Sequence, residues 1–560
     1  MPAETIGSLS SSAPRPPAGR GSRGYRHWLP LSLILAAWTM RVSFLGRQSL
    51  WYDEAFSALL ARYDLGEITR RTALDTMPPL YYYILHVQQA VAGLDDFSLR
   101  FLSAAFGVGC VALVLSVGRK LFDSTVGLVA AGITAISPFQ VFYGQEARMY
   151  TLLGFLSLLV IFLLLRAWDA NDLRSWIPYA VATAALLYVH NLAALTLVPV
   201  AAVVVFRRFR AGKRLRGAST KSWSIRSGGR LCPPGAGQGA RPTPPLADTA
   251  VRHYESAKGL PDAPLRGLLF AHLGAILLFS PWLVVSLQQA ERVARSFWVS
   301  PPTAFQVPAT FYVFLFGGSL PPLLWPAGLF LVLLSLGIFG LRAYRAAVAA
   351  ERASLAVVVL WLVAPPIFSY LVSLWRPIYL ERTLIVSSYA LYLFVGWGLA
   401  RLRPRGVSLA LGLLLVALCG ISLGRWYFDA TAGKPPLRLA ASYVRAHAGP
   451  GDAVAHTSDG SYLPFALYLG REQSLLLGDP EREAGTARAQ STYVALGIEP
   501  DSFEQAARGH ERTWLIVAPD HSVEWQLGVR EELSRRYPLL ESTDIRGIWM
   551  GLYDTRGIQP

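Results

Sequence analysis

The feature that most constrains this chain is a series of long apolar runs, most of them bounded by arginine or lysine. Of its 560 residues, 53% are hydrophobic and only 16% are charged, and the mean hydropathy is +0.37. Several runs approach or reach the roughly 17–25 residues that a spanning helix needs. We therefore predict a polytopic α-helical membrane protein. The predicted spans, eleven in all, lie near residues 28–46, 99–117, 125–142, 151–166, 176–190, 192–206, 266–286, 322–341, 354–374, 383–400 and 407–424.

The distribution of charge predicts an orientation. The net charge is +16, yet residues 425–560 contain 14 Lys+Arg and 18 Asp+Glu, so the basic excess lies elsewhere, in loops between apolar runs. This pattern follows the positive-inside rule and argues against a nucleic-acid partner. We expect residues 1–27 to be a basic cytoplasmic N-terminus. An odd number of spans then places residues 425–560 outside a bacterial plasma membrane.

The chain divides into two predicted domains, a transmembrane domain at 28–424 and an α/β domain at 425–560. The second contains an amphipathic stretch at 437–448 and short apolar strands at 453–455, 514–518 and 548–553. Residues 207–265, rich in Pro, Gly, Ser and Arg, are predicted to be a disordered cytoplasmic insertion. The short apolar segments 78–86 and 305–316 are expected to be helices lying in the membrane interface.

Cysteine usage indicates neither a disulfide framework nor a metal site. Cys110 and Cys419 fall in apolar runs, and Cys232 falls in the low-complexity insertion. Their separation fits no metal-binding or redox motif.

Three polar constellations are expected to meet at the outer face. Asp53 and Glu54 follow the first span, with Arg62 close behind, and the segments 145–150 and 376–382 lie at outer junctions of later spans. Carboxylates beside arginines suit a base facing a bound phosphate, because the planar guanidinium donates two hydrogen bonds at once. The candidate catalytic residues are Asp53, Glu54 and Glu146. The candidate substrate-binding residues are Arg62, Tyr82, His86, Arg148, Tyr150, Arg376, Tyr379 and Arg382.

Each of these residues also has a structural interpretation. Asp53 and Glu54 suit the first turn of a helix, where the helix dipole favours negative charge. Glu146 and Arg148 suit an ion pair at a helix end, and Arg376 and Arg382 suit arginines that extend to the membrane interface. The same snorkelling interpretation is the simplest one for Arg41. His86 and His190 are better explained as packed or interfacial residues than as metal ligands.

The order of the motifs resembles the bacterial branch of the dolichyl-phosphate-mannose-protein mannosyltransferase superfamily, membrane enzymes of glycosyltransferase family 39 type with the GT-C fold. The resemblance covers roughly residues 28–425. It rests on the segments Ser49–Ser57, Pro78–Tyr82, Arg100–Ser103 with Gly107, Ser137–Pro138, Gln145–Tyr150 and Pro377–Thr383.

The resemblance implies a polyprenyl- or dolichyl-phosphate sugar as donor. It implies that Asp53 is the catalytic carboxylate, that Glu146 is a second acidic position, and that Arg376 and Arg382 contact phosphate. Two departures are visible: Met77 stands where relatives often have His or Lys, and Thr383 stands where they often have Tyr. Some relatives bind a divalent metal and others do not, so a metal cofactor stays open.

We therefore expect an inverting glycosyltransferase that moves a sugar from a polyprenyl-phosphate donor to an acceptor glycan, lipid or protein at the outer face of the bilayer. Two alternatives remain: a protein that binds or translocates a lipid-linked sugar without transferring it, and an O-antigen ligase or polymerase. A ligase is expected to carry its charged residues in a large late external loop, whereas the densest signal here is early.

Overall fold

The computed structural model describes residues 21–170, 172–208, 263–295, 299–346, 349–471, 474–478, 487–518 and 523–558. Residues 1–20 of the basic N-terminus and residues 209–262 of the predicted insertion, with Cys232, lie outside this set. Predictions made for those segments are therefore not addressed by the structure.

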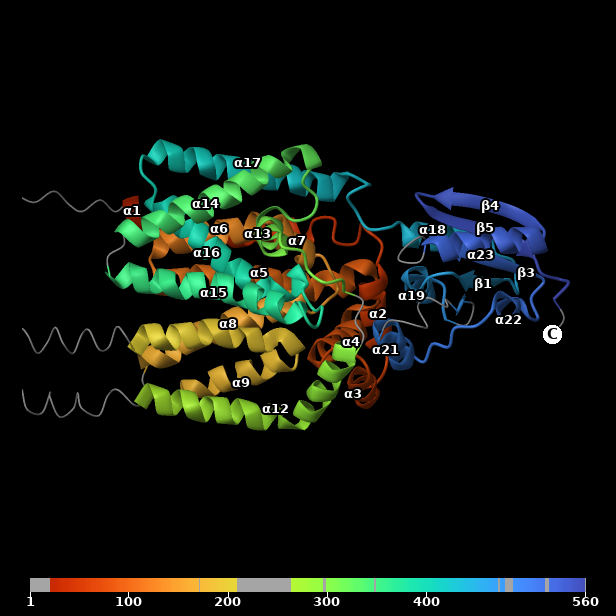
Figure 1. Cartoon of the computed structure of the whole chain (residues 1–560), viewed down its shortest axis with the longest axis horizontal. Helices are drawn as coiled ribbons and strands as arrows, with labels where there is room; N and C mark the ends of the chain where they lie inside the picture. The colour runs from red at the N-terminus through yellow and green to blue at the C-terminus, as the bar shows by residue number, and fades with distance from the viewer. Residues whose placement is uncertain are drawn as a thin grey trace, which may run out of the picture.

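The described chain forms a helical bundle followed by a smaller domain that contains a sheet (Figure 1). The bundle consists of α1 (Gly21–Val42), α2 (Tyr52–Leu60), α3 (Leu65–Leu74), α4 (Leu80–Ala92), α5 (Asp96–Leu121), α6 (Ser124–Ile136), α7 (Pro138–Gly144), α8 (Tyr150–Ala170), α9 (Trp176–Leu187), η1 (Asn191–Thr196), α12 (Ala263–Arg295), α13 (Gln306–Phe316), η2 (Pro322–Leu324), α14 (Trp325–Ala346), α15 (Ala349–Ser373), η3 (Glu381–Leu384), α16 (Ile385–Arg401) and α17 (Arg405–Phe428).

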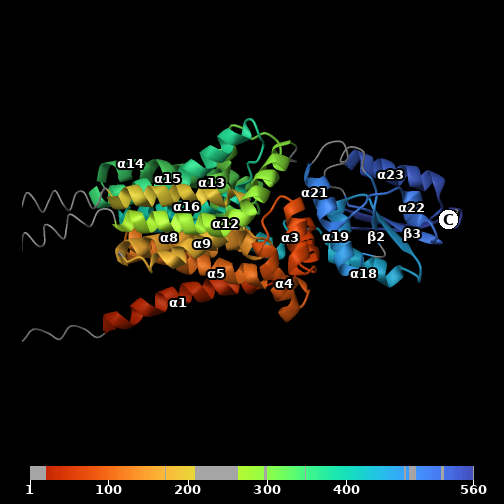
Figure 2. The ribbon, with the colours of Figure 1, turned by 90° about the horizontal axis from the view of Figure 1, so that it is seen from below.

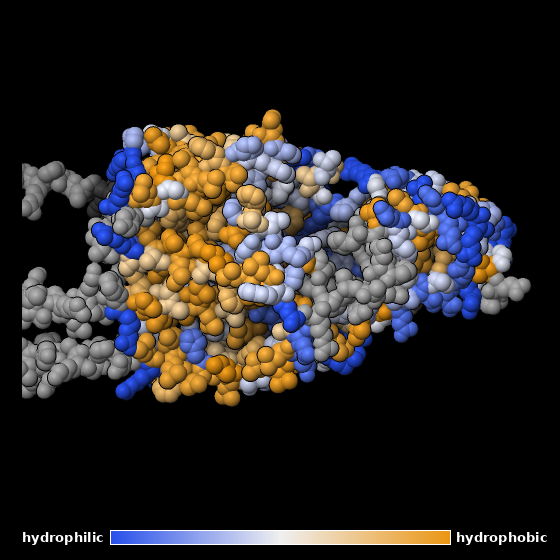
Figure 3. Space-filling model, in the orientation of Figure 1, coloured by the Kyte–Doolittle hydropathy of each residue, from blue (hydrophilic) through white to orange (hydrophobic). Residues whose placement is uncertain are grey.

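The predicted polytopic helical class is confirmed. By length and composition, eight of the described helices can cross a membrane, or nine if the bent pair α6–α7 counts as one span. Two further predicted spans, 28–46 and 176–190, coincide with the shorter apolar helices Trp28–Val42 and Trp176–Leu187. Figure 3 shows apolar residues across the side of the bundle, with polar residues at the bundle end far from the smaller domain.

Ion pairs gather several helix ends at that far end of the bundle. Lys120 and Arg207 both contact Asp169, at 3.1 and 2.5 Å. Arg401 contacts Asp123 at 2.5 Å and Glu351 at 2.7 Å. These partly exposed pairs add little stability. They do bring together basic residues that the positive-inside rule assigned to the cytoplasmic side of the membrane. Helix α1 begins at this same end of the bundle (Figure 2).

The predicted span 125–142 is broken, because α6 and α7 meet at an angle of 59°. Pro138 has no N–H, so the carbonyl group of Thr134 loses its helical partner. Arg41 replaces it: Nη2 donates to the Thr134 carbonyl and Nη1 to the Ala135 carbonyl, each at 3.1 Å. The expectation that Arg41 snorkels to the interface is therefore wrong, since its side chain is 0% exposed and completes a broken helix inside the bundle.

The two segments expected in the interface are short helices: α4 lies at the end of the bundle nearest the smaller domain, whereas α13 packs among the bundle helices against α7, α14 and α16 (Figures 1 and 2). Segment 78–86 begins α4, which has 13 residues, and segment 305–316 is α13, with 11 residues. Both are shorter than a spanning helix requires. Helices α3 and α4 lie between the bundle and the smaller domain (Figure 2).

The C-terminal part is an α/β domain, as predicted. It contains α18 (Leu437–His447), β1 (Ala453–His456), α19 (Asp459–Tyr468), β2 (Ser474–Leu476), α21 (Ala487–Leu496), α22 (Phe503–Ala507), β3 (Arg512–Val517), α23 (Val523–Arg536), β4 (Leu539–Ile545) and β5 (Ile548–Asp554).

The strands of this domain form one mixed sheet in the order β2-β1-β3-β5-β4. Strands β1, β2 and β3 are parallel, whereas β5 is antiparallel to β3 and β4. The predicted strands correspond to β1, β3 and β5. The edge strands β2 and β4 were not predicted, because β2 has three residues and β4 is polar and largely exposed.

The smaller domain packs directly on the bundle through α19, which lies against α2, and α21, which lies against α3. Buried residues of both helices, including Leu463 and Leu496, belong to the same hydrophobic core as the bundle. Polar contacts reinforce the junction: Arg438 forms an ion pair with Asp96 at 2.8 Å. The end of the bundle is therefore closed by a folded domain.

Replacing Gly107 by alanine should destabilise the bundle. A Cβ atom at Gly107 would lie 2.8 Å from Nε of the buried Arg41, which cannot move without losing its carbonyl contacts. We expect the free energy of unfolding to fall by about 1–3 kcal/mol, measured as a lower thermal midpoint in detergent. Gly412→Ala is the matched control, because nothing lies within 4 Å of a Cβ there. Equal midpoints for the two variants would contradict this account of Arg41.

Candidate active site

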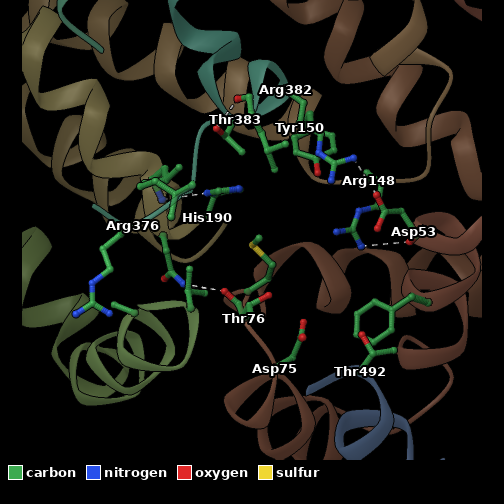
Figure 4. A pocket seen from close by; sticks show the side chains of 18 of the residues that line it. Asp53, Asp75, Thr76, Arg148, Tyr150, His190, Arg376, Arg382, Thr383 and Thr492 are labelled. Atoms are coloured by element: carbon green, nitrogen blue, oxygen red, sulfur yellow. Dashed lines mark hydrogen bonds and ion pairs between the residues drawn. The ribbon is translucent and has the colours of Figure 1, made fainter. Parts of the chain in front are cut away.

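A cavity of about 340 Å³ lies where the bundle meets the C-terminal domain (Figure 4). Its wall combines residues of α2, the turn before α4, the loop before α8, the start of η1, α12, the segment around η3, and α21 of the C-terminal domain. The lining residues are Tyr52, Asp53, Phe56, Asp75, Thr76, Met77, Arg148, Tyr150, His190, Asn191, Leu192, Ala290, Val293, Val372, Arg376, Ile378, Leu380, Arg382, Thr383 and Thr492.

Two adjacent carboxylates of α2 face different surroundings. Asp53 and Glu54 lie in the first turn of the helix, where the dipole favours negative charge. The Glu54 carboxylate accepts from the Trp51 backbone N–H at 3.4 Å, which satisfies one backbone donor at the start of the helix. Successive helical residues project about 100° apart. Asp53 therefore lines the cavity, and Glu54 faces the interior of the bundle.

Asp53 is held at the cavity wall by two arginines. Arg382 Nη1 lies 3.1 Å from Asp53 Oδ2. Arg148 Nη1 donates to the backbone carbonyl of Asp53 at 3.2 Å and to Ser57 Oγ at 2.9 Å. The Asp53 side chain is almost fully buried, so the guanidinium of Arg382 offsets the cost of burying an ionised carboxylate. Figure 4 shows Asp53 and Arg148 on the same side of the cavity.

Glu54 is enclosed by cations and is 0% exposed. Arg100 grips it through two hydrogen bonds of 2.7 Å, and Lys434 Nζ lies 2.8 Å from Oε2. The Ala147 backbone N–H also donates to it, at 2.9 Å. Burial raises the pKa of Glu54, but the charges of Arg100 and Lys434 outweigh burial and lower this pKa to about 2. These contacts indicate that Glu54 is ionised and has a structural role.

Glu146 lies behind the cavity wall, next to Glu54. Its Oε1 accepts from Trp51 Nε1 at 2.7 Å and lies 4.0 Å from Lys434 Nζ. Burial raises the pKa of Glu146, the charge of Lys434 opposes this effect, and the neighbouring Glu54 adds to it. The structure shows no Glu146–Arg148 ion pair among the described residues, since Arg148 contacts Asp53 and Ser57.

The predicted substrate-binding residues fall into two groups. Four of them line the cavity: Arg148, Tyr150, Arg376 and Arg382. Arg382 also lies over the Tyr150 ring at 5.6 Å, and Arg376 is exposed at the rim. The others lie off the wall. Tyr82 is buried behind Phe56, and Nδ1 of His86 donates to the Ala61 carbonyl. Tyr379 forms a hydrogen bond with Thr310, and Arg62 is exposed beyond α2.

Sequence reasoning did not single out several residues that build the site. Arg100 carried a detectable signal, because an arginine inside an apolar span requires a partner. No such signal marked Lys434, Asp75 or Thr492. Lys434 and Thr492 reach the site only because the C-terminal domain docks on the bundle, and Asp75 reaches it through the turn before α4. Tyr52 Oη and Thr492 Oγ1 are 2.9 Å apart, and Ser491 Oγ donates to Asp75 Oδ1 at 3.1 Å.

Two neighbouring polar atoms of the wall are buried without a hydrogen-bond partner among the described residues. They are Nε2 of His190 and Oδ1 of Asn191. Buried polar groups are nearly always paired. A cavity lined by unpaired polar atoms is therefore suited to a polar ligand.

No group of three or more His, Cys, Asp or Glu side chains within the described ranges is arranged to hold a metal ion. The residues that the structure describes thus offer no fitted set of ligands for a divalent cation. No step proposed below passes through a metal.

Comparison with known proteins agrees with this architecture. The sequence profile of the dolichyl-phosphate-mannose-protein mannosyltransferase family matches residues 76–218. No curated protein matches the chain significantly. Among solved structures, ArnT from Cupriavidus metallidurans in the apo state has a TM-score of 0.60 at 13% identity, covering 96% of this chain and 98% of that one. ArnT bound to undecaprenyl phosphate has a TM-score of 0.57 at 13% identity, with 96% and 99% covered.

A third similar structure is the archaeal oligosaccharyltransferase AglB from Archaeoglobus fulgidus in complex with an inhibitory peptide and a dolichol-phosphate. Its TM-score is 0.51 at 11% identity, with 97% of this chain and 75% of that one covered. At such identities, structural likeness establishes a shared fold. The predicted resemblance is thus confirmed: the chain has the GT-C glycosyltransferase fold, and residues 76–218 match the dolichyl-phosphate-mannose-protein mannosyltransferase family.

Proposed function

We propose that this protein transfers a sugar from a polyprenyl-phosphate donor to an acceptor hydroxyl, with Asp53 as the base. The observation that carries the proposal is the placement of Asp53 on the wall of a buried cavity, in contact with Arg382 and beside Arg148. Structures of the same fold contain undecaprenyl phosphate and dolichol-phosphate, which supports a lipid-linked phosphate as the donor.

The cavity has the polarity that this reaction needs. Arg148, Arg382 and, at the rim, Arg376 provide positive charge for the donor phosphate. Asp75, with Thr492 on α21, provides an acidic and hydroxyl-bearing wall. Figure 4 shows Arg148 and Arg382 on one side of the cavity and Asp75 and Thr492 on another, with Asp53 beside Arg148. The acceptor would approach from the second wall, so α21 contributes to its selection.

The bond changes are those of an inverting displacement. The acceptor oxygen attacks the anomeric carbon and forms the new glycosidic bond, and its proton passes to Asp53. The bond between the anomeric carbon and the phosphate oxygen breaks, and polyprenyl phosphate leaves with the electron pair. Arginines stabilise the charge that develops on the phosphate, so no general acid is needed. When phosphate engages Arg382, that guanidinium is shared, and Asp53 becomes a stronger base.

We assign Glu54 and Glu146 to support of the site and not to proton transfer. Glu54 is saturated by Arg100, Lys434 and a backbone N–H, and neither glutamate lines the cavity. We propose that the cavity faces the outside of a bacterial plasma membrane, because the basic helix ends lie at the opposite end of the bundle.

Asp53→Asn should abolish most sugar transfer. The amide keeps the shape of the side chain but cannot accept the proton, so we expect a loss of about 10²-fold or more. The assay is transfer from radiolabelled polyprenyl-phosphate sugars in membranes that contain the full chain. Asp172→Asn is the matched control, because Asp172 is fully exposed between α8 and α9. Its activity should equal that of the wild type.

The same assay separates the proposal from its alternative. A wild-type protein that binds the lipid-linked sugar and never transfers it, with Asp53→Asn unchanged, would favour binding or translocation. Transfer that survives in Asp53→Asn would show that another group is the base.

Glu54→Gln should act mainly on stability. Removing one partner of a buried ion pair costs about 3–5 kcal/mol, so the thermal midpoint should fall well below that of Asp53→Asn. The difference from wild type should shrink as the pH falls from 4.5 toward 2, because protonation then removes the same charge from wild-type Glu54. A midpoint equal to wild type at neutral pH, together with lost transfer, would instead make Glu54 a catalytic residue.

A further inference from the structure

We infer that His190 is a donor-binding residue: the N–H at Nε2 of its neutral imidazole donates a hydrogen bond to the phosphate of the polyprenyl-phosphate donor. This inference deepens the proposed function and rests on it for the identity of the ligand. It is carried by the geometry of the imidazole at the cavity wall.

The contacts of His190 fix which ring nitrogen carries the proton. His190 precedes η1, and its Nδ1 lies 3.0 Å from the backbone N of Leu192. A backbone N–H can only donate, so Nδ1 must be the acceptor and holds no proton. In the neutral ring the proton is then on Nε2. That atom is buried, and no described residue accepts from it.

The imidazole is neutral at physiological pH. Burial, together with the nearby charges of Arg148 and Arg382, lowers the pKa of His190 to about 3. Protonation would place a third positive charge beside two guanidinium groups. The neutral tautomer avoids that repulsion and still offers one N–H to an anion.

The position of Nε2 suits a hydrogen bond to a phosphate bound in the cavity. His190, Arg148 and Arg382 line one cavity, and Figure 4 shows the imidazole reaching into it between Arg376 and Arg148. An anion held by the two arginines would be within reach of Nε2–H. Met77, which lines the same cavity, has no N–H or O–H group to donate. His190 thus supplies from η1 a donor that position 77 lacks.

The test is direct binding of a polyprenyl monophosphate and of the matching polyprenol to the purified full chain. The ratio of the two affinities measures recognition of the phosphate alone. We expect His190→Leu to lower this ratio by about tenfold or more, as for loss of a hydrogen bond to a charged group, with the polyprenol affinity unchanged. His190→Gln should recover most of the ratio, since its amide N–H can reach the place of Nε2–H.

Controls distinguish binding from support of the fold. Both His190 variants lose the acceptor for Leu192, so equal losses in Leu and Gln would assign His190 to capping η1 and overturn the inference. His272→Leu is the matched control, because His272 contacts Tyr179 within the bundle and does not line the cavity. Its ratio should match the wild type.

The outcomes also separate this inference from the proposed function. A wild type that prefers the phosphate through His190 but transfers no sugar would refute the transferase proposal and leave this inference standing. A wild type that transfers sugar while His190→Leu keeps the full phosphate preference would refute this inference alone. A wild type without any preference for the phosphate over the alcohol would refute it as well.

Discussion

The rest of the site depends on one buried ion cluster, in which Glu54 is held by Arg100 and Lys434. These residues come from α2, the start of α5, and the segment that follows α17. Arg100 also donates to the carbonyl groups of Leu45, Gln48 and Ser49, so it fixes the loop that leads into α2. Desolvating three charges is costly, and only their close mutual contacts make the arrangement stable. The cluster sets the rotation of α2, and through it the direction in which Asp53 points.

The two adjacent carboxylates of α2 have different roles: Glu54 is structural, and Asp53 is the proposed base. Glu54 faces the interior of the bundle, accepts hydrogen bonds from several donors and stays ionised. Asp53 faces the cavity, where it forms an ion pair with Arg382, a group that an incoming anion can share. A similar division is seen among the cations: Arg41 and Arg100 complete the backbone of the bundle, whereas Arg148 and Arg382 line the cavity. Among these four arginines, two therefore bind backbone groups inside the bundle and two are placed where a ligand can reach them.

Much of the fold could be predicted from the sequence, because apolar length and flanking charge report on spanning helices directly. Pattern alone could not reveal the bend at Pro138 or the buried role of Arg41, since both depend on which helices pack together. The short strand β2 and the polar edge strand β4 lack the alternation that marks a half-buried strand. For the site, Asp53, Arg148 and Arg382 were predicted because they stand in dense polar motifs at span ends. Lys434, Thr492 and the cavity-facing role of His190 depend on contacts between distant segments, which no local pattern encodes.

The joint construction of the cavity also has a consequence for how the protein is made. Glu54 and Lys434 are separated by 380 positions in the chain, and Tyr52 and Thr492 by 440. The ribosome therefore adds Lys434 just after the last helix of the bundle, which ends at Phe428, and adds Thr492 of the cavity wall later still. Until α21 emerges and docks, the newly inserted chain lacks the part of the cavity wall that contains Thr492. Completion of the cavity wall is consequently a late event in biosynthesis, and a chain that ended before α21 would lack the wall residue Thr492.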